Sequence, residues 1–171
     1  MRLHPLLMRL RALLLPAPLL LAPLLLAACG FHLQGRTQLP RSLASARIET
    51  RDSQSDFYSA LRASLLSSGA RLDGPMADAA TIHILSDDVS ERVLTVSATR
   101  NIPTAFLLSY SVRISVDFQG RELLAPELHT VTREYSFDER ALLAKQRERE
   151  ALQQALADDL VALIMRRLAA L

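Results

Sequence analysis

Hydrophobic residues in this chain repeat with two different periods, and the period changes twice along the sequence. The first regular segment predicts a helix over residues 53–68, because Phe57, Leu61 and Leu65 lie four residues apart on one helical face. Gly69 is the expected end of that helix, since glycine readily adopts the left-handed conformation found there. Two serines could cap its start, Ser53 and Ser55.

Period-two alternation replaces the helical period in the middle of the chain. Residues 106–118 place seven large apolar residues on one parity and a single one on the other, which predicts a long strand with one buried face. Gln119-Gly120 is the expected turn after it. Shorter strands are expected at residues 46–50, 81–85, 92–97 and 130–137.

The last segment returns to the helical period. Residues 141–171 contain neither Pro nor Gly and predict one long helix, which Ser136 or Asp138 could cap. Its expected apolar stripe comprises Leu142, Leu152, Leu156, Leu160, Leu163, Ile164 and Leu168. Strands grouped between two helices predict an α+β fold, with the helices on the apolar face of a mostly antiparallel sheet.

The first 28 residues have the layout of a secretory signal. Arg2, Arg9 and Arg11 give the segment a basic start, and a stretch of Leu, Ala and Pro follows. The apolar stretch is shorter than the roughly 20 residues that a membrane-spanning helix needs, and prolines interrupt it. We therefore expect residues 1–28 to be removed.

The signal ends in a motif that predicts a lipid anchor. Leu26-Ala27-Ala28-Cys29 resembles the bacterial lipobox, in which the chain is cut before a cysteine that carries acyl chains. Gly30 follows where an Asp would resemble an inner-membrane retention signal, so the outer membrane is the expected destination. We expect residues 29–45 to be the lipidated N-terminus with its lead-in, and residues 46–171 to be a single domain.

Charge and cysteine content exclude several classes of protein. Three of the 20 Lys and Arg lie in residues 1–28, so 17 face the 18 Asp and Glu of the remaining chain, whose net charge is −1. That balance gives no bulk attraction for nucleic acid. One cysteine cannot form an internal disulfide or a cysteine-based zinc site within one chain.

The sequence offers no catalytic or metal-binding constellation. Phosphate-binding glycine loops and the G-x-S-x-G motif are absent. His32, His83 and His129 are not paired with carboxylates at metal-ligand spacing on a helix. We therefore predict a protein that is not an enzyme and binds neither metal nor cofactor.

Two cations stand out among the charged residues. Lys145 is the only lysine beside 19 arginines, and Arg100 lies in the turn expected before the long strand. Arginine suits bidentate contacts with phosphate, and lysine is a compact point charge. Composition alone favours ordinary solvated side chains at both positions.

Several motifs together resemble the LptE family of LPS-assembly lipoproteins in Gram-negative outer membranes. The mature start Cys29-Gly30-Phe31-His32-Leu33 is similar to the family's, as are Leu39-Pro40, the segment from Phe137-Asp138 to Ala141-Leu142-Leu143-Ala144-Lys145, and the closing stretch Asp159-Leu160 to Leu168. Gln34 departs from the arginine often found there. The resemblance covers the whole mature chain.

This resemblance implies two helices packed on one face of a four-stranded sheet. It implies a periplasm-facing, lipid-anchored protein that binds LPS, plugs the lumen of the β-barrel LptD and assists its assembly. Arg100 and Lys145 match the family's LPS-contact positions, with the phosphates of lipid A as partners. Two alternatives stay open: an outer-membrane adaptor for barrel assembly that does not bind LPS, and a lipid-anchored hydrolase that uses carboxylates.

Overall fold

The computed structural model describes residues 39–72, 74, 79–137 and 141–171. The chain divides into two units, Met1–Gly35 and Arg36–Leu171, and every described residue belongs to the second. The expected signal peptide and the lipidation site Cys29 lie outside the described residues.

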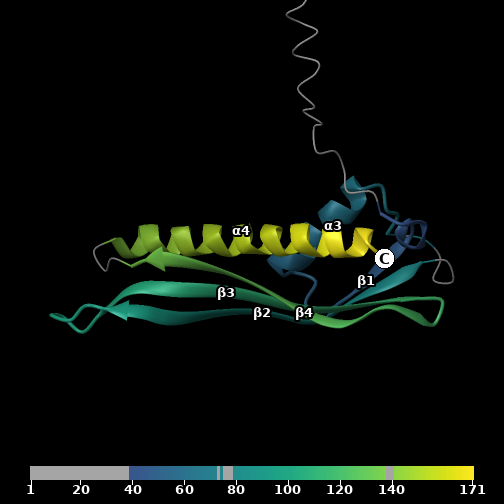
Figure 1. The fold of residues 1–171 in the computed structure, drawn as a ribbon. Helices are drawn as coiled ribbons and strands as arrows, with labels where there is room; N and C mark the ends of the chain where they lie inside the picture. The colour runs from purple at the N-terminus through teal and green to yellow at the C-terminus, as the bar shows by residue number, and fades with distance from the viewer. Residues whose placement is uncertain (1–38, 73, 75–78, 138–140) are drawn as a thin grey trace, which may run out of the picture. The chain divides into compact units, whose positions relative to one another are not determined.

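The helices and strands of this unit follow the expected order along the chain (Figure 1). The elements are η1 (Arg41–Leu43), β1 (Ala46–Glu49), α3 (Asp56–Ser67), β2 (Ala80–Val96), β3 (Pro103–Phe118), β4 (Arg121–Ser136) and α4 (Leu142–Ala169). The strands form one sheet in the order β1-β2-β3-β4, parallel between β1 and β2 and antiparallel elsewhere. A parallel pair needs a crossover connection, which α3 supplies.

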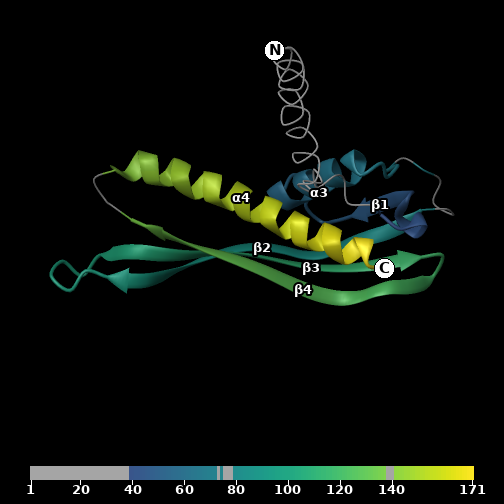
Figure 2. The same ribbon diagram turned by 45° about the horizontal axis from the view of Figure 1, so that its top comes forward.

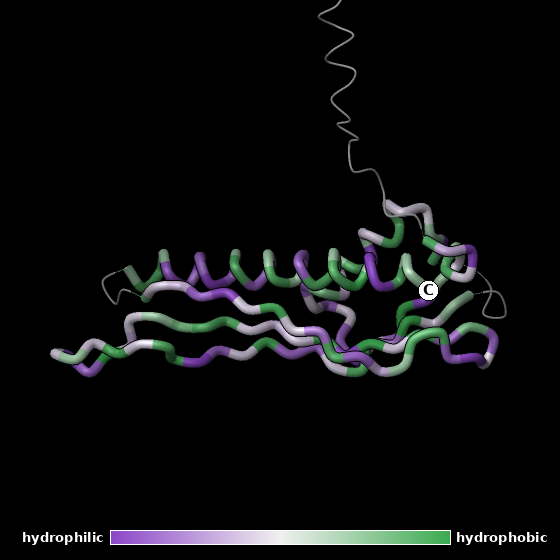
Figure 3. The backbone as a smooth tube through the Cα atoms, in the orientation of Figure 1, coloured by the Kyte–Doolittle hydropathy of each residue, from purple (hydrophilic) through white to green (hydrophobic). Residues whose placement is uncertain are grey.

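Both helices cover the same face of the sheet, and the core lies between the two layers (Figures 1 and 2). The three predicted apolar residues of α3 are fully buried, and so is the middle of the predicted face of β3, from Leu108 to Val116. Hydropathy alternates along the strands as that pattern requires (Figure 3). The predicted α+β fold with two helices on a mixed four-stranded sheet is confirmed.

Local signals in the sequence place the ends of α3. The Ser55 hydroxyl accepts a hydrogen bond from the Tyr58 N–H at 3.1 Å, so Ser55 is the N-cap. Gly69 has φ +89, and the Ala70 N–H donates to the Leu65 carbonyl at 3.0 Å. This is the Schellman arrangement that ends a helix, because the left-handed residue turns the chain back onto the last carbonyls.

The β3–β4 turn also follows the sequence. Gln119 and Gly120 both have positive φ, of 50° and 75°. Two consecutive residues of this kind make the hairpin turn whose twist matches that of the flanking strands.

Three boundaries differ from the prediction. The strands expected at residues 81–85 and 92–97 form one strand, β2, which ends at Val96, because residues 86–91 also pair with β3. The register shifts at Leu85, where a bulge interrupts the alternation. β4 begins at Arg121 and not at residue 130, because pairing with β3 holds a stretch whose own alternation is weak. The N-cap of α4 is Ala141 without a side-chain hydrogen bond, and Ser136 lies in β4; Asp138 is outside the described residues.

The apolar stripe of α4 also starts later than predicted. Leu142 is 61% exposed, and the buried residues of this helix begin at Leu156. Figure 2 shows the reason, since α4 runs obliquely across the strands and reaches the centre of the sheet only with its second half. The first turns of α4 therefore lie at the margin of the core.

Ion pairs join α4 to the strands beneath it. Arg167 donates two hydrogen bonds to the Glu127 carboxylate on β4, at 2.8 and 3.1 Å, and Arg133 pairs with Asp159 at 2.9 Å. The hydrogen bonds from Arg167 lower the pKa of Glu127 below its usual value. A carboxylate with a lowered pKa contributes stability above its unfolded pKa and loses that contribution as the pH falls through its folded pKa.

We therefore expect Glu127→Gln to reduce the acid sensitivity of folding. The free energy of unfolding of the wild type should fall more steeply than that of the variant between about pH 5 and pH 3, where an ordinary Glu titrates. Urea titrations at several pH values measure this difference. Glu122→Gln, an exposed acid on β4 outside this pair, is the matched control and should keep the wild-type slope. Parallel curves for wild type and Glu127→Gln would contradict the expectation.

Candidate functional site

The structure places both predicted cations at the same end of the sheet. Arg100 lies in the turn between β2 and β3, and Lys145 lies in the first turns of α4. The β2–β3 turn and the start of α4 lie at the same end because Ser136, the last residue of β4 before α4, pairs with Ala105 at the start of β3. The β2–β3 hairpin extends past the beginning of α4 (Figure 1). Arg100 is exposed in the turn of this hairpin, and Lys145 is partly buried.

The hairpin tip that carries Arg100 is held by its own hydrogen bonds. Across the turn, the Ser97 N–H donates to the Ile102 carbonyl and the Asn101 N–H donates to the Ser97 carbonyl, both at 2.8 Å. Asn101 has φ 53, a left-handed conformation that asparagine tolerates better than most residues. Arg100 therefore projects from a defined turn.

Lys145 is partly shielded by its neighbours. Its ammonium donates to the Ser136 hydroxyl at 3.2 Å and pairs with the Glu148 carboxylate at 2.7 Å, and its side chain is 18% exposed. An ion pair between residues three apart on a helix surface contributes only a few tenths of a kcal/mol to stability. Separating Lys145 from Glu148 therefore costs about this small free energy. An anion with more charge than a carboxylate can compete for this ammonium.

A cavity of about 250 Å³ lies beside Lys145, between the start of α4 and the ends of the strands. Its lining residues are Glu91, Phe106, Tyr135, Phe137, Leu142, Lys145, Gln146 and Arg149. Phe106 stacks on Tyr135 with ring centroids 5.7 Å apart and meets Phe137 edge-on at 5.5 Å. These arrangements are the ones that aromatic rings favour, so the three rings form a continuous apolar wall.

A polar network fixes the inner side of this cavity. The Tyr135 hydroxyl and the Arg149 Nε both donate to Glu91 Oε2, at 2.9 and 2.8 Å. Burial, together with the hydrogen bond to Glu91, raises the pKa of Tyr135 to about 12. The hydroxyl therefore remains a donor at neutral pH, and the network ties α4 to β2 and β4.

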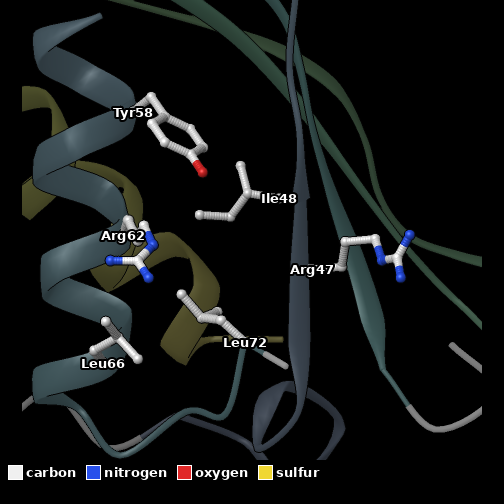
Figure 4. A pocket seen from close by; sticks show the side chains of 6 residues that line it. All are labelled: Arg47, Ile48, Tyr58, Arg62, Leu66 and Leu72. Carbon is white, nitrogen blue, oxygen red and sulfur yellow. The ribbon is translucent and has the colours of Figure 1, made fainter. Parts of the chain in front are cut away.

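A second hollow of about 310 Å³ lies between α3 and β1, away from both predicted cations. Tyr58, Arg62 and Leu66 of α3 face Ile48 and Leu72 across it (Figure 4). Arg47 of β1 also lines this space, and its guanidinium points away from α3 in the same view, whereas Arg62 lies on the α3 side. Neither Arg100 nor Lys145 contributes to this second hollow.

The two histidines of the described residues lie close to acids. His83 lies between two carboxylates of neighbouring strands, 2.9 Å from Asp117 and 3.3 Å from Glu49. His129 lies 3.5 Å from Glu127, two residues away on the same strand, β4. Within the described ranges no group of three or more His, Cys, Asp or Glu is arranged to hold a metal ion. The contacts of His83 cross between strands, so sequence spacing could not reveal them.

Sequence reasoning missed the cavity and two of the residues that make it polar on one side, Glu91 and Arg149. One signal was present. Lys145 and Arg149 continue the line of Leu152 and Leu156 on the face of α4 that is directed to the sheet. A helix that replaces apolar residues by long cations on its inner face leaves part of the opposite apolar surface uncovered.

Comparison with known proteins identifies the family of the chain. The family model LptE, described as lipopolysaccharide-assembly, matches residues 42–168, which is most of the chain. The chain belongs to the LptE family. A curated family member from Pectobacterium atrosepticum, the LPS-assembly lipoprotein LptE, is 28% identical over 145 residues, which cover 83% of this chain and 77% of the relative.

Solved structures share the fold of the LptE family chain. A minor lipoprotein from Acinetobacter baumannii aligns with a TM-score of 0.65 and 22% identity, over 77% of this chain and 94% of the other. A lipoprotein B from Nitrosomonas europaea aligns with a TM-score of 0.67 and 24% identity, over 82% and 91% of the two chains. At this level of identity the likeness establishes the arrangement of helices and strands.

Family membership confirms the resemblance seen in the sequence. The chain is a member of a family of lipopolysaccharide-assembly lipoproteins and not of an enzyme family. No helix in the described ranges combines the length and apolar character needed to cross a membrane.

Proposed function

We propose that this LptE family member is anchored in the outer membrane through lipidated Cys29, faces the periplasm, binds LPS, and plugs the LptD β-barrel while assisting its assembly. The observation that carries the LPS-binding part is the joint position of Arg100 and Lys145 at one end of the sheet, next to an apolar cavity. LPS combines phosphates with acyl chains, and such a ligand needs cations and apolar surface side by side.

The cations suit phosphate in different ways. Arg100 projects from the hairpin tip, where a guanidinium could form bidentate contacts with a phosphate. Lys145 lies at the cavity mouth, where its ammonium could take a phosphate in place of Glu148. Hydrogen bonds to charged groups contribute about 1.5–3 kcal/mol each, which corresponds to about tenfold or more in affinity.

The sheet face opposite the helices supports the role as a plug. Ser109 and Ser111 of β3 lie there opposite Thr132 and Thr130 of β4, and Ser111 and Thr130 join across the two strands by a hydrogen bond of 2.9 Å. The interior of a large outer-membrane barrel is polar, and the largest barrels are closed by a plug. A polar sheet face is compatible with such a lumen.

One experiment tests both parts of the proposal. The full chain is purified through a C-terminal tag from outer membranes in mild detergent, and the bound β-barrel and LPS are quantified for wild type and for Arg100→Ala/Lys145→Ala. We expect both to retain a stoichiometric barrel, and the double variant to bind LPS at least about tenfold more weakly. Arg51→Ala/Arg121→Ala removes the same charge from exposed positions elsewhere and should bind LPS like wild type.

The other outcomes separate the alternatives. A purified chain with no barrel would exclude the plug. A barrel with no LPS bound by the wild type would leave an assembly adaptor. Unchanged LPS binding by the double variant would remove Arg100 and Lys145 from the site, and loss of the barrel as well would assign them to packing.

A further inference from the structure

The apolar wall formed by Phe106, Tyr135 and Phe137 is only partly covered by apolar side chains of α4. Phe106 continues the buried face of β3 toward the hairpin, and Tyr135 and Phe137 continue that of β4. Over the central part of the sheet, α4 supplies buried Leu156 and Leu160 to such a surface. Near the three rings it supplies the exposed Leu142 and the long polar side chains of Lys145, Gln146 and Arg149, and the cavity remains between α4 and the rings.

Long polar side chains close this space incompletely. Lys145, Gln146 and Arg149 of α4 line this space, and the charged ends of Lys145 and Arg149 are held by Glu148 and Glu91. Their aliphatic stems can line an apolar space while the charges stay at its margin. The result is an apolar slot with a cationic rim.

Lys145 and Arg149 are the cations of this rim, and each is paired with one acid, Glu148 and Glu91 respectively. Glu148 is exposed and lies outside the lining, so the lining itself carries two cations and one acid. An occupant with an apolar chain and an anionic group next to it would match both the wall and the rim. An uncharged apolar occupant would give Lys145 and Arg149 no partner besides Glu148 and Glu91. A soluble anion without an apolar part would leave the three rings uncovered.

We propose that this cavity receives a fatty acyl chain of the bound lipid, with Phe106, Phe137 and Leu142 contacting the chain and Lys145 positioning the neighbouring phosphate. The inference rests on the proposed LPS binding, and it adds the residues that contact the apolar part of the ligand. Leu142 is 61% exposed, so its side chain gains the burial that the fold does not provide. Burial of each methylene strengthens binding by about fourfold.

A photo-cross-linking experiment on the full chain in its own outer membrane tests the contact. Phe137 is replaced by the photo-reactive analogue p-benzoylphenylalanine, cells are irradiated, and the purified chain is treated with alkali to cleave ester-linked acyl chains from the sugar. We expect a fatty acyl group to remain on the peptide that contains position 137. The same analogue at Leu143, which is 77% exposed and does not line the cavity, should give at least tenfold less acyl adduct.

A cavity-filling variant gives an independent test. Gln146 lines the cavity from an exposed position of α4, where a larger residue is compatible with the fold. We expect Gln146→Trp to weaken binding of intact LPS by at least about tenfold, through loss of two or more buried methylenes. Its affinity for fully deacylated LPS, which keeps the phosphates, should equal that of the wild type.

The results distinguish this inference from the function on which it rests. Wild-type LPS binding that depends on Arg100 and Lys145, with no acyl adduct at position 137 and no effect of Gln146→Trp, would overturn the acyl-chain site alone. An adduct at 137 that is attached through the sugar, and not through an acyl chain, after alkali would do the same. Absence of LPS binding by the wild type would overturn both.

Discussion

Shortening Leu160 to alanine is expected to destabilise this protein by about 2–5 kcal/mol, the largest single effect that we predict. Leu160 is fully buried at the middle of α4, in the core shared with the sheet. The variant loses the transfer free energy of the removed methyl groups and leaves a cavity that the surrounding side chains fill only in part. A domain of ordinary stability has only 5–15 kcal/mol to lose, so much of its stability depends on this contact.

Urea denaturation followed by circular dichroism measures the loss. The matched control is Leu143→Ala, because Leu143 lies on the same helix and is 77% exposed. Its stability should stay within about 0.5 kcal/mol of the wild type. Equal losses in the two variants would show that burial of α4 against the sheet does not stabilise the fold.

The second large effect is expected from removal of one hydroxyl group, in Tyr110→Phe. The Tyr110 oxygen accepts a hydrogen bond from the buried Phe57 N–H at 3.3 Å, in the first turn of α3. Helix N-termini have N–H groups without partners inside the helix, and here a side chain of β3 supplies one. Loss of this acceptor leaves a buried donor unpaired, which costs about 1–3 kcal/mol.

Burial, with a further contribution from the hydrogen bond to Asp87, raises the pKa of Tyr110 well above its ordinary value. The hydroxyl therefore stays protonated and can donate to Asp87 while it accepts from α3. Tyr58→Phe, on the same helix and only partly buried, is the control and should change the free energy of unfolding by less than about 0.5 kcal/mol. A Tyr110→Phe protein as stable as this control would show that the contact contributes nothing to the fold.

Together these contacts explain why the candidate site lies where it does. The core that Leu160 and Tyr110 stabilise is formed under the second half of α4 and under α3. The first half of α4 continues beyond it over Phe106 and Phe137 and carries Lys145. The site thus lies at the margin of the packed helix and sheet layers. A cationic and an apolar surface meet there, outside the core.

The fold was largely accessible from the sequence because its signals are local. The repeat of Phe57, Leu61 and Leu65 determines which face of α3 is buried, and Gly69 ends that helix by its left-handed conformation. Strict alternation determines the buried face of β3, since neighbouring side chains of a strand point to opposite sides. The family was also visible, because its short motifs occur in the right order along the chain.

The errors arose where distant segments determine the local structure. β2 is continuous because β3 pairs along its whole length, although a bulge at Leu85 breaks its alternation. Leu142 belongs to the helical repeat and is nevertheless exposed, because the oblique path of α4 takes its first turns beyond the core. A periodic pattern indicates which residues share one face of a helix. It does not indicate how far the sheet opposite that face extends.

By itself, the sequence determined the order of elements, their buried faces, the family, and the two cations Arg100 and Lys145 as candidates for phosphate contact. Only the tertiary structure decided that both cations lie at one end of the sheet and that an aromatic cavity adjoins Lys145. The physical reason is that this end combines residues from β2, β3, β4 and α4, whose separations along the chain exceed the range of any periodic pattern. Strand pairing and the angle of α4 bring them together.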